Sequence, residues 1–161
     1  MRVCGIDPGA NGAICVLDSH DPAHVALLDL GKVTPFDAYQ WLHKQQPNSV
    51  WIEDVHSLFG MSAKSNFGFG KNLGIVTAIA KIATNGQAVK TVAPKVWQKY
   101  VGVTVRGKAI KKQVAEIANT LYPTANLYGK RGGLLDGRAD ALMIAHYGLN
   151  KDEETYETEE K

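Results

Sequence analysis

The chain has few cysteines, no long apolar run and no zinc-binding spacing, which argues against several classes of protein. Among its 161 residues only Cys4 and Cys15 are cysteines, too few for a disulfide framework, and we expect both to be reduced core residues. No apolar run approaches the roughly 20 residues that cross a bilayer, and the start lacks the apolar segment of a signal peptide. No His/Cys spacing typical of a zinc site is present. We therefore expect a cytoplasmic protein with no membrane association.

Acidic residues are scarce in one half of the chain and abundant at its end. Residues 94–138 contain nine Lys or Arg against only Glu116 and Asp136. Residues 150–161, by contrast, hold six acids and two lysines, with almost no apolar residue to bury. A basic half favours a polyanionic partner, although a solvated lysine-rich helix face would explain it equally well. We predict one domain over residues 1–149, followed by a disordered acidic tail over residues 150–161.

The order of the predicted elements indicates an α/β domain with a mixed sheet. Three short β-rich runs come first, and α/β units follow them. The predicted strands are 2–7, 13–18, 24–30, 49–55 and 89–92, and the predicted helices are 35–46, 71–83, 94–100, 108–121 and 135–149. A meander followed by such units predicts a five-stranded sheet, antiparallel in its first part and parallel in its second, with helices on both faces.

Four carboxylates occupy positions that chemistry, rather than packing, explains. Asp7 and Glu53 each end an apolar strand, and a right-handed crossover would bring both strand ends to the same sheet edge. Asp136 and Asp140 stand four residues apart and so share one face of the last helix. Clustered carboxylates repel one another unless cations lie between them, and all-oxygen ligands suit Mg²⁺. This pattern predicts a metal-dependent nuclease with these four acids as metal ligands.

The segment after Glu53 mixes aromatic, basic and small residues. Residues 56–70 are predicted to be irregular, and the stretch 56–71 offers four candidate DNA contacts: Lys64, Phe67, Phe69 and Lys71. A phenylalanine between glycines and lysines is able to wedge between bases and unstack them. The competing interpretation, that these rings fold back into the core, stays open at this point.

The residues around the four acids resemble those of a known family. The start Gly5-Ile6-Asp7-Pro8-Gly9, the strand end Ile52-Glu53 and the closing segment 136–142 look like the RuvC family of Holliday junction resolvases. The segment Pro94-Lys95-Val96-Trp97-Gln98-Lys99 resembles a phage-encoded branch of that family. RuvC proteins often separate the last two acids by three residues, whereas the separation here is four; both keep a shared helical face.

This resemblance implies an RNase H-like fold and a homodimer that nicks two opposing strands of a four-way DNA junction with Mg²⁺ or Mn²⁺. It implies that Asp7, Glu53, Asp136 and Asp140 hold the metal, and that the helix over 71–83 forms the dimer interface. Burial of that helix against its own sheet would explain its small and β-branched residues equally well. It also implies that Lys111 or Lys112 contacts the scissile phosphate, with Lys108 and Arg138 as further DNA contacts. The host cytoplasm is then the expected location if the protein is phage-encoded.

Three other functions share part of this pattern. An actin-like ATPase uses a similar Asp7-Pro8-Gly9 turn, but that fold needs two such domains. A non-catalytic DNA-binding module explains the basic half and leaves the four acids unexplained. The third alternative keeps the enzyme and changes the substrate, to Y-forks and flaps in a broader phage debranching nuclease, or to RNA.

Overall fold

The computed structural model describes residues 1–55, 60, 62–86 and 89–159. In these residues one sheet forms from β1 (Arg2–Ile6), β2 (Ala13–Asp18), β3 (Asp21–Asp29), β4 (Ser49–Glu53) and β5 (Val89–Val92). The strand order is β3-β2-β1-β4-β5. Strands β1, β2 and β3 pair antiparallel, whereas β4 pairs parallel with both β1 and β5. The predicted mixed sheet, a meander extended by parallel strands, is confirmed.

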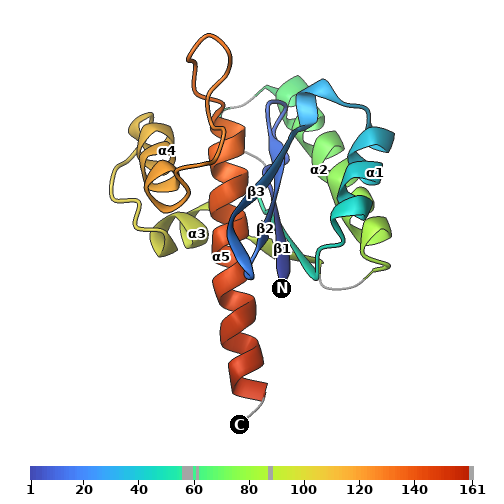
Figure 1. The fold of residues 1–161 in the computed structure, drawn as a ribbon. Helices are drawn as coiled ribbons and strands as arrows, with labels where there is room; N and C mark the ends of the chain where they lie inside the picture. Colours follow the sequence, from blue (N-terminus) through green and yellow to red (C-terminus); the bar gives the residue numbers. More distant parts are fainter. Residues whose placement is uncertain (56–59, 61, 87–88, 160–161) are drawn as a thin grey trace.

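Helices cover both faces of this sheet (Figure 1). The 3₁₀ turn η1 (Leu30–Lys32) leads into α1 (Pro35–Gln45), which packs beside α2 (Ala63–Ala83) on one face. On the other face lie α3 (Pro94–Tyr100), α4 (Ala109–Leu121) and α5 (Asp136–Glu159). Helix α5 runs along β1 and β2, so its first turn lies at the sheet edge where β1 ends.

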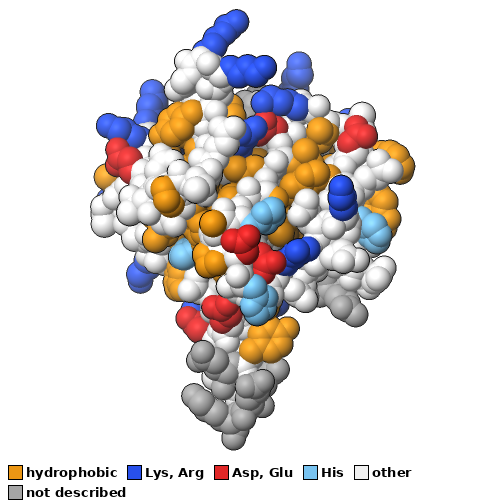
Figure 2. Space-filling model, in the orientation of Figure 1, with side chains coloured by type: hydrophobic (Ala, Val, Ile, Leu, Met, Phe, Trp, Pro, Cys, Tyr) orange, Lys and Arg blue, Asp and Glu red, His pale blue; other side chains and the backbone are white. Residues whose placement is uncertain are grey.

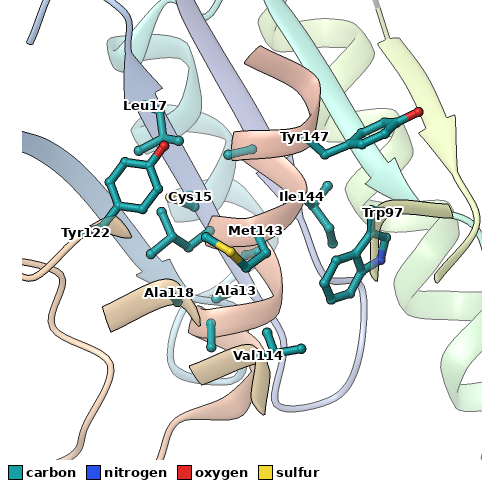
Figure 3. Close-up of a cluster of buried hydrophobic side chains, with 14 of the residues drawn as sticks. Ala13, Cys15, Leu17, Trp97, Val114, Ala118, Tyr122, Met143, Ile144 and Tyr147 are labelled. Carbon is teal, nitrogen blue, oxygen red and sulfur yellow. The ribbon is translucent and has the colours of Figure 1, made fainter. Parts of the chain in front are cut away.

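Alternating side chains of the central strands form two separate cores. Cys4 and Ile6 of β1 point toward α1 and α2, whereas Cys15 of β2 points toward α5. Figure 3 shows the second core, in which Met143 and Ile144 of α5 pack with side chains from β2, α3 and α4. Both cysteines are free and buried on opposite sheet faces, so they cannot bond to each other in this fold. The expectation of reduced core cysteines is confirmed.

The helix after β4 begins earlier than predicted. We expected irregular structure up to residue 70, but α2 begins at Ala63, where the Ser62 hydroxyl accepts the backbone N–H of Ser65. The glycines in this stretch lower helix propensity, and packing of the second half of α2 on the sheet overrides that preference. Residues 56–59 and 61 of the predicted loop lie outside the described residues.

The predicted end of the last helix is also wrong, because α5 continues from Leu149 to Glu159. Asp152, only 3% exposed, accepts hydrogen bonds from the Ser49 hydroxyl, from the Trp51 indole at 3.2 Å and from the Lys90 ammonium at 2.6 Å. This paired carboxylate anchors the helix to β4 and β5, so residues 150–159 are helical rather than disordered. None of the described helices combines the length and apolar character needed to span a membrane.

Candidate active site

Asp7 follows directly on β1 and opens a tight turn. Its carboxylate accepts the backbone N–H of Gly9 at 2.9 Å, and its own N–H donates to Ala13 at 3.1 Å. A Cβ on Gly12 would overlap the carbonyl oxygen of Asp7, so the turn requires glycine there. The turn therefore holds the Asp7 side chain at the edge of the sheet with a fixed orientation.

Glu53 is the last residue of β4, and the parallel pairing of β4 with β1 brings it to the same edge as Asp7. The Trp97 indole N–H donates to the Glu53 carboxylate at 3.0 Å. Trp97 belongs to α3 and is fully buried in the core that α5 also lines, so this donor is held rigidly. Sequence reasoning used the segment around Trp97 only as a family resemblance and missed this contact. A lone tryptophan in a short helix after β5 was the available signal.

Helix α5 supplies the remaining two acids from its first two turns. Its backbone lies unusually close to the sheet, since a Cβ on Gly137 would overlap the Asn11 carbonyl oxygen and a Cβ on Gly5 would overlap Ala141. These two glycines let the helix begin directly against the Asp7 turn. Asp136 and Asp140 are thereby delivered to the edge where β1 and β4 end.

The charges of these side chains act on one another, which places them in one group, here called the acid cluster (Asp7, Glu53, Asp136 and Asp140). Burial, and then the charges of the other three acids, raise the pKa of Asp140 to about 8. Burial and the charge of Asp7 raise the pKa of Glu53 to about 7, against the opposing Trp97 hydrogen bond. Burial also raises the pKa of Asp7. The structure thus brings the four predicted carboxylates together.

The carboxylates of the acid cluster stand farther apart than the ligands of a bound metal ion. Among the described residues, no three His, Cys, Asp or Glu side chains stand close enough to hold one ion. Instead the Lys111 ammonium bonds to Asp136, and this bond raises the pKa of Lys111. The donor set still fits a hard divalent cation, because all of its donor atoms are carboxylate oxygens. A cation bound among them would also offset the cost of ionising Glu53 and Asp140, whose pKa values are raised.

The predicted DNA contacts at α4 and α5 differ in which acids, if any, they pair with. Lys111 reaches the acid cluster, whereas Lys112 points away from it and pairs with Glu116 at 3.8 Å. Lys108 precedes α4 and is exposed. Arg138 does not face the cluster: it forms a two-pronged ion pair with Asp29, at 2.6 and 2.8 Å, and so ties α5 to β3. This pairing lowers the pKa of Asp29 to about 2 and argues against Arg138 as a DNA contact.

The four candidates after Glu53 all lie on α2 instead of on a loop. Phe67 is 76% exposed, Phe69 is half-buried, and Lys64 and Lys71 are exposed. The interpretation that Phe67 folds back into the core is therefore wrong. The role of these residues in DNA binding stays a prediction.

Comparison with known proteins identifies the fold. The mixed sheet and its helices have the RuvC arrangement, which is an RNase H-like fold. Thermus thermophilus RuvC, solved with a Holliday junction substrate, matches with a TM-score of 0.62 and 20% identity over 90% of each chain.

Two further resolvase structures match at lower similarity. The yeast mitochondrial Holliday junction resolvase Ydc2 has a TM-score of 0.55 and 14% identity, over 89% of this chain and 75% of the other. The fowlpox virus resolvase, solved with Holliday junction DNA, has a TM-score of 0.50 and 15% identity over 92% and 99%. No family model and no curated protein sequence matches the chain.

Proposed function

We propose that the protein is a metal-dependent, structure-selective endonuclease that resolves four-way DNA junctions by paired nicks. The observation that carries this proposal is the acid cluster: carboxylates from β1, β4 and α5 meet at one edge of an RNase H-like sheet. A purely structural role would not explain four acids at one edge. Burial, and then repulsion between the acids, raises the pKa of Asp7, Glu53 and Asp140, and each raised pKa records a free-energy cost to the folded protein. The resolvases of the same fold agree with this proposal.

Asp7, Glu53, Asp136 and Asp140 would hold Mg²⁺, or Mn²⁺ in its place. Bound there, two such ions would activate a water molecule and stabilise the leaving 3′ oxygen of the scissile phosphodiester. Trp97 keeps the Glu53 carboxylate in one orientation through its indole N–H. Lys111, whose side chain is 65% exposed and bonds to Asp136, is a cation at the acid cluster that is able to pair with a substrate phosphate.

A homodimer would supply the second active site for the opposing strand. The outward face of α2 offers a surface for it, because Phe67 and Ile82 are 76% and 62% exposed, and Gly70, Gly74 and Ala78 lie exposed between them. A Cβ at either glycine would meet nothing within 4 Å, so a second helix is able to approach this face closely. Exposed apolar side chains on such a face favour a protein partner.

The test is a panel of labelled four-way, Y-shaped, flapped and linear DNA, incubated with Mg²⁺ or with a chelator. We expect Mg²⁺-dependent nicking that is fastest on the four-way junction. A cruciform plasmid should be linearised rather than left singly nicked, because a dimer makes both cuts during one encounter. Equal cutting of forks and flaps would instead identify the broader debranching nuclease.

The matched variants are Asp7→Asn and Glu53→Gln, which preserve shape and remove charge. Each should reduce nicking by at least 100-fold, since a lost metal ligand costs about 3 kcal/mol or more of transition-state stabilisation. Junction binding in chelator should persist in both variants. Activity within tenfold of the parent in either variant would refute the assignment of the acid cluster as the active site.

A further inference from the structure

A hairpin-like segment (Leu127–Leu135), here called the basic hairpin, connects α4 to α5. Tyr128 and Leu134 form an isolated antiparallel bridge, and the Gly129 N–H donates to the Gly133 carbonyl at 2.8 Å. Gly132 closes the turn with a φ of 77°. These backbone bonds give the segment a defined shape that does not depend on a partner.

The basic hairpin is fixed at the end of the molecule that carries the acid cluster. Its last residue, Leu135, directly precedes Asp136 and donates its N–H to Leu127 at 2.9 Å. On the other side, Asn119 of α4 donates to the Tyr128 hydroxyl at 3.1 Å. Figure 1 shows the loop before α5 projecting beyond the sheet at this end. The position of the basic hairpin is therefore coupled to that of Asp136, the first acid of α5.

The tip of the basic hairpin carries two adjacent positive charges, Lys130 and Arg131, both exposed. Residues 121–135 include no acid, and no described residue forms an ion pair with either charge. Lys111, Lys112 and Arg138 differ from them, because each is paired with an acid of the chain itself. Figure 2 shows Lys and Arg side chains at this extremity of the molecule. The two charges are thus available to a partner.

We propose that the basic hairpin binds the phosphodiester backbone of a duplex arm next to the scissile phosphate. This proposal rests on the proposed function and adds a contact outside the acid cluster. Five residues separate Arg131 from Asp136, so at about 3.3 Å per residue the tip lies within roughly 17 Å of the start of α5. Phosphates of one strand follow every ~3.4 Å along the duplex axis, so the contact falls within about five base pairs of the cut.

Binding of the Lys130→Ala/Arg131→Ala variant to a four-way junction in chelator, as a function of salt concentration, tests the proposal. The control is Lys44→Ala/Lys151→Ala, which removes two charges remote from the acid cluster. Each lost phosphate contact should reduce the salt slope by about 0.9, which corresponds to roughly eightfold in affinity at 0.1 M relative to 1 M salt. The control should keep the parent slope, and Lys130→Arg/Arg131→Lys should keep most of the affinity.

A second arm of the experiment locates the contact on the DNA. Neutral methylphosphonate linkages about five base pairs from the cut should weaken binding by the parent protein and not by the Ala/Ala variant. Parent-like affinity and salt slope in the Ala/Ala variant would overturn the proposal while leaving the nuclease intact. Absence of junction binding and cutting by the parent itself would refute the proposed function instead.

Discussion

Removal of one acid from the cluster should stabilise the metal-free protein. Burial and the charges of Asp7, Glu53 and Asp136 raise the pKa of Asp140 to about 8, whereas an aspartate in the unfolded chain titrates near ~3.9. Between these values the folded protein binds a proton that the unfolded chain has lost. The contribution of Asp140 is therefore fully present below about pH 4 and is lost as the pH rises through 8. The substitution Asp140→Asn removes this loss.

The size of the effect follows from the difference in pKa. One pKa unit corresponds to about 1.4 kcal/mol, so a difference of about four units sets an upper limit of roughly 6 kcal/mol. Solvent at the sheet edge and the Lys111 ammonium screen the repulsion, so we expect roughly 2 kcal/mol at pH 8. For a domain of this size that corresponds to a rise of about 4–8 °C in Tm.

Thermal unfolding in chelator at pH 5 and pH 8 measures this difference, with Asp152→Asn as the matched control. Asp152 is a buried acid at the opposite end whose charge is paired with Lys90, so its substitution should destabilise the protein at both pH values. Added Mg²⁺ at 100 times its Kd should stabilise the parent by about 2.7 kcal/mol and Asp140→Asn by less. A parent that is no less stable at pH 8 than at pH 5, or an Asp140→Asn variant that melts lower at pH 8 as the control does, would refute this reasoning.

Two further substitutions separate positioning from binding. Trp97→Phe keeps the buried ring and removes the donor to Glu53, so we expect single-turnover nicking to fall about tenfold and the Mg²⁺ requirement to rise, with unchanged junction affinity. If the nicking rate and the Mg²⁺ requirement both stay at the parent values, the hydrogen bond from the indole does not orient Glu53. Arg138→Ala breaks the pair with Asp29 and should lower the free energy of unfolding by about 2 kcal/mol, measured by urea denaturation at pH 7. Its junction affinity should stay within twofold, and a larger loss would restore Arg138 as a DNA contact.

The sheet and the positions of the four acids could be predicted because local patterns specify them. Asp7 and Glu53 end apolar runs, and right-handed crossover of β1 to β4 leaves only one edge on which both can lie. The i, i+4 spacing of Asp136 and Asp140 needs only that α5 be a helix. A strand end and an i, i+4 spacing are both defined by residues close together in the sequence, so they can be recognised without knowledge of the fold.

The structure departs from the sequence pattern where side chains have partners that are distant in sequence. Asp136 and Asp140 flank Arg138 in sequence, yet its partner in the fold is Asp29, which lies 109 residues away. Asp152 was assigned to a disordered tail because its neighbours are polar, yet Lys90 and Ser49 meet it across the sheet. Charge counting along a chain detects neither pair, since it treats every ionised side chain as solvated.

The close approach of α5 to the sheet connects the fold to the chemistry. At Gly5 and Gly137 the helix touches strand and turn backbone with no side chain between, so the α5 acids are placed by rigid main-chain contacts. Burial, and then repulsion between the acids, raises the pKa of Glu53 and Asp140, so a closer approach of these carboxylates has a free-energy cost. A cation that removes this repulsion would also displace Lys111 from Asp136. Under the proposed function, cation binding would therefore release Lys111 to bind a substrate phosphate.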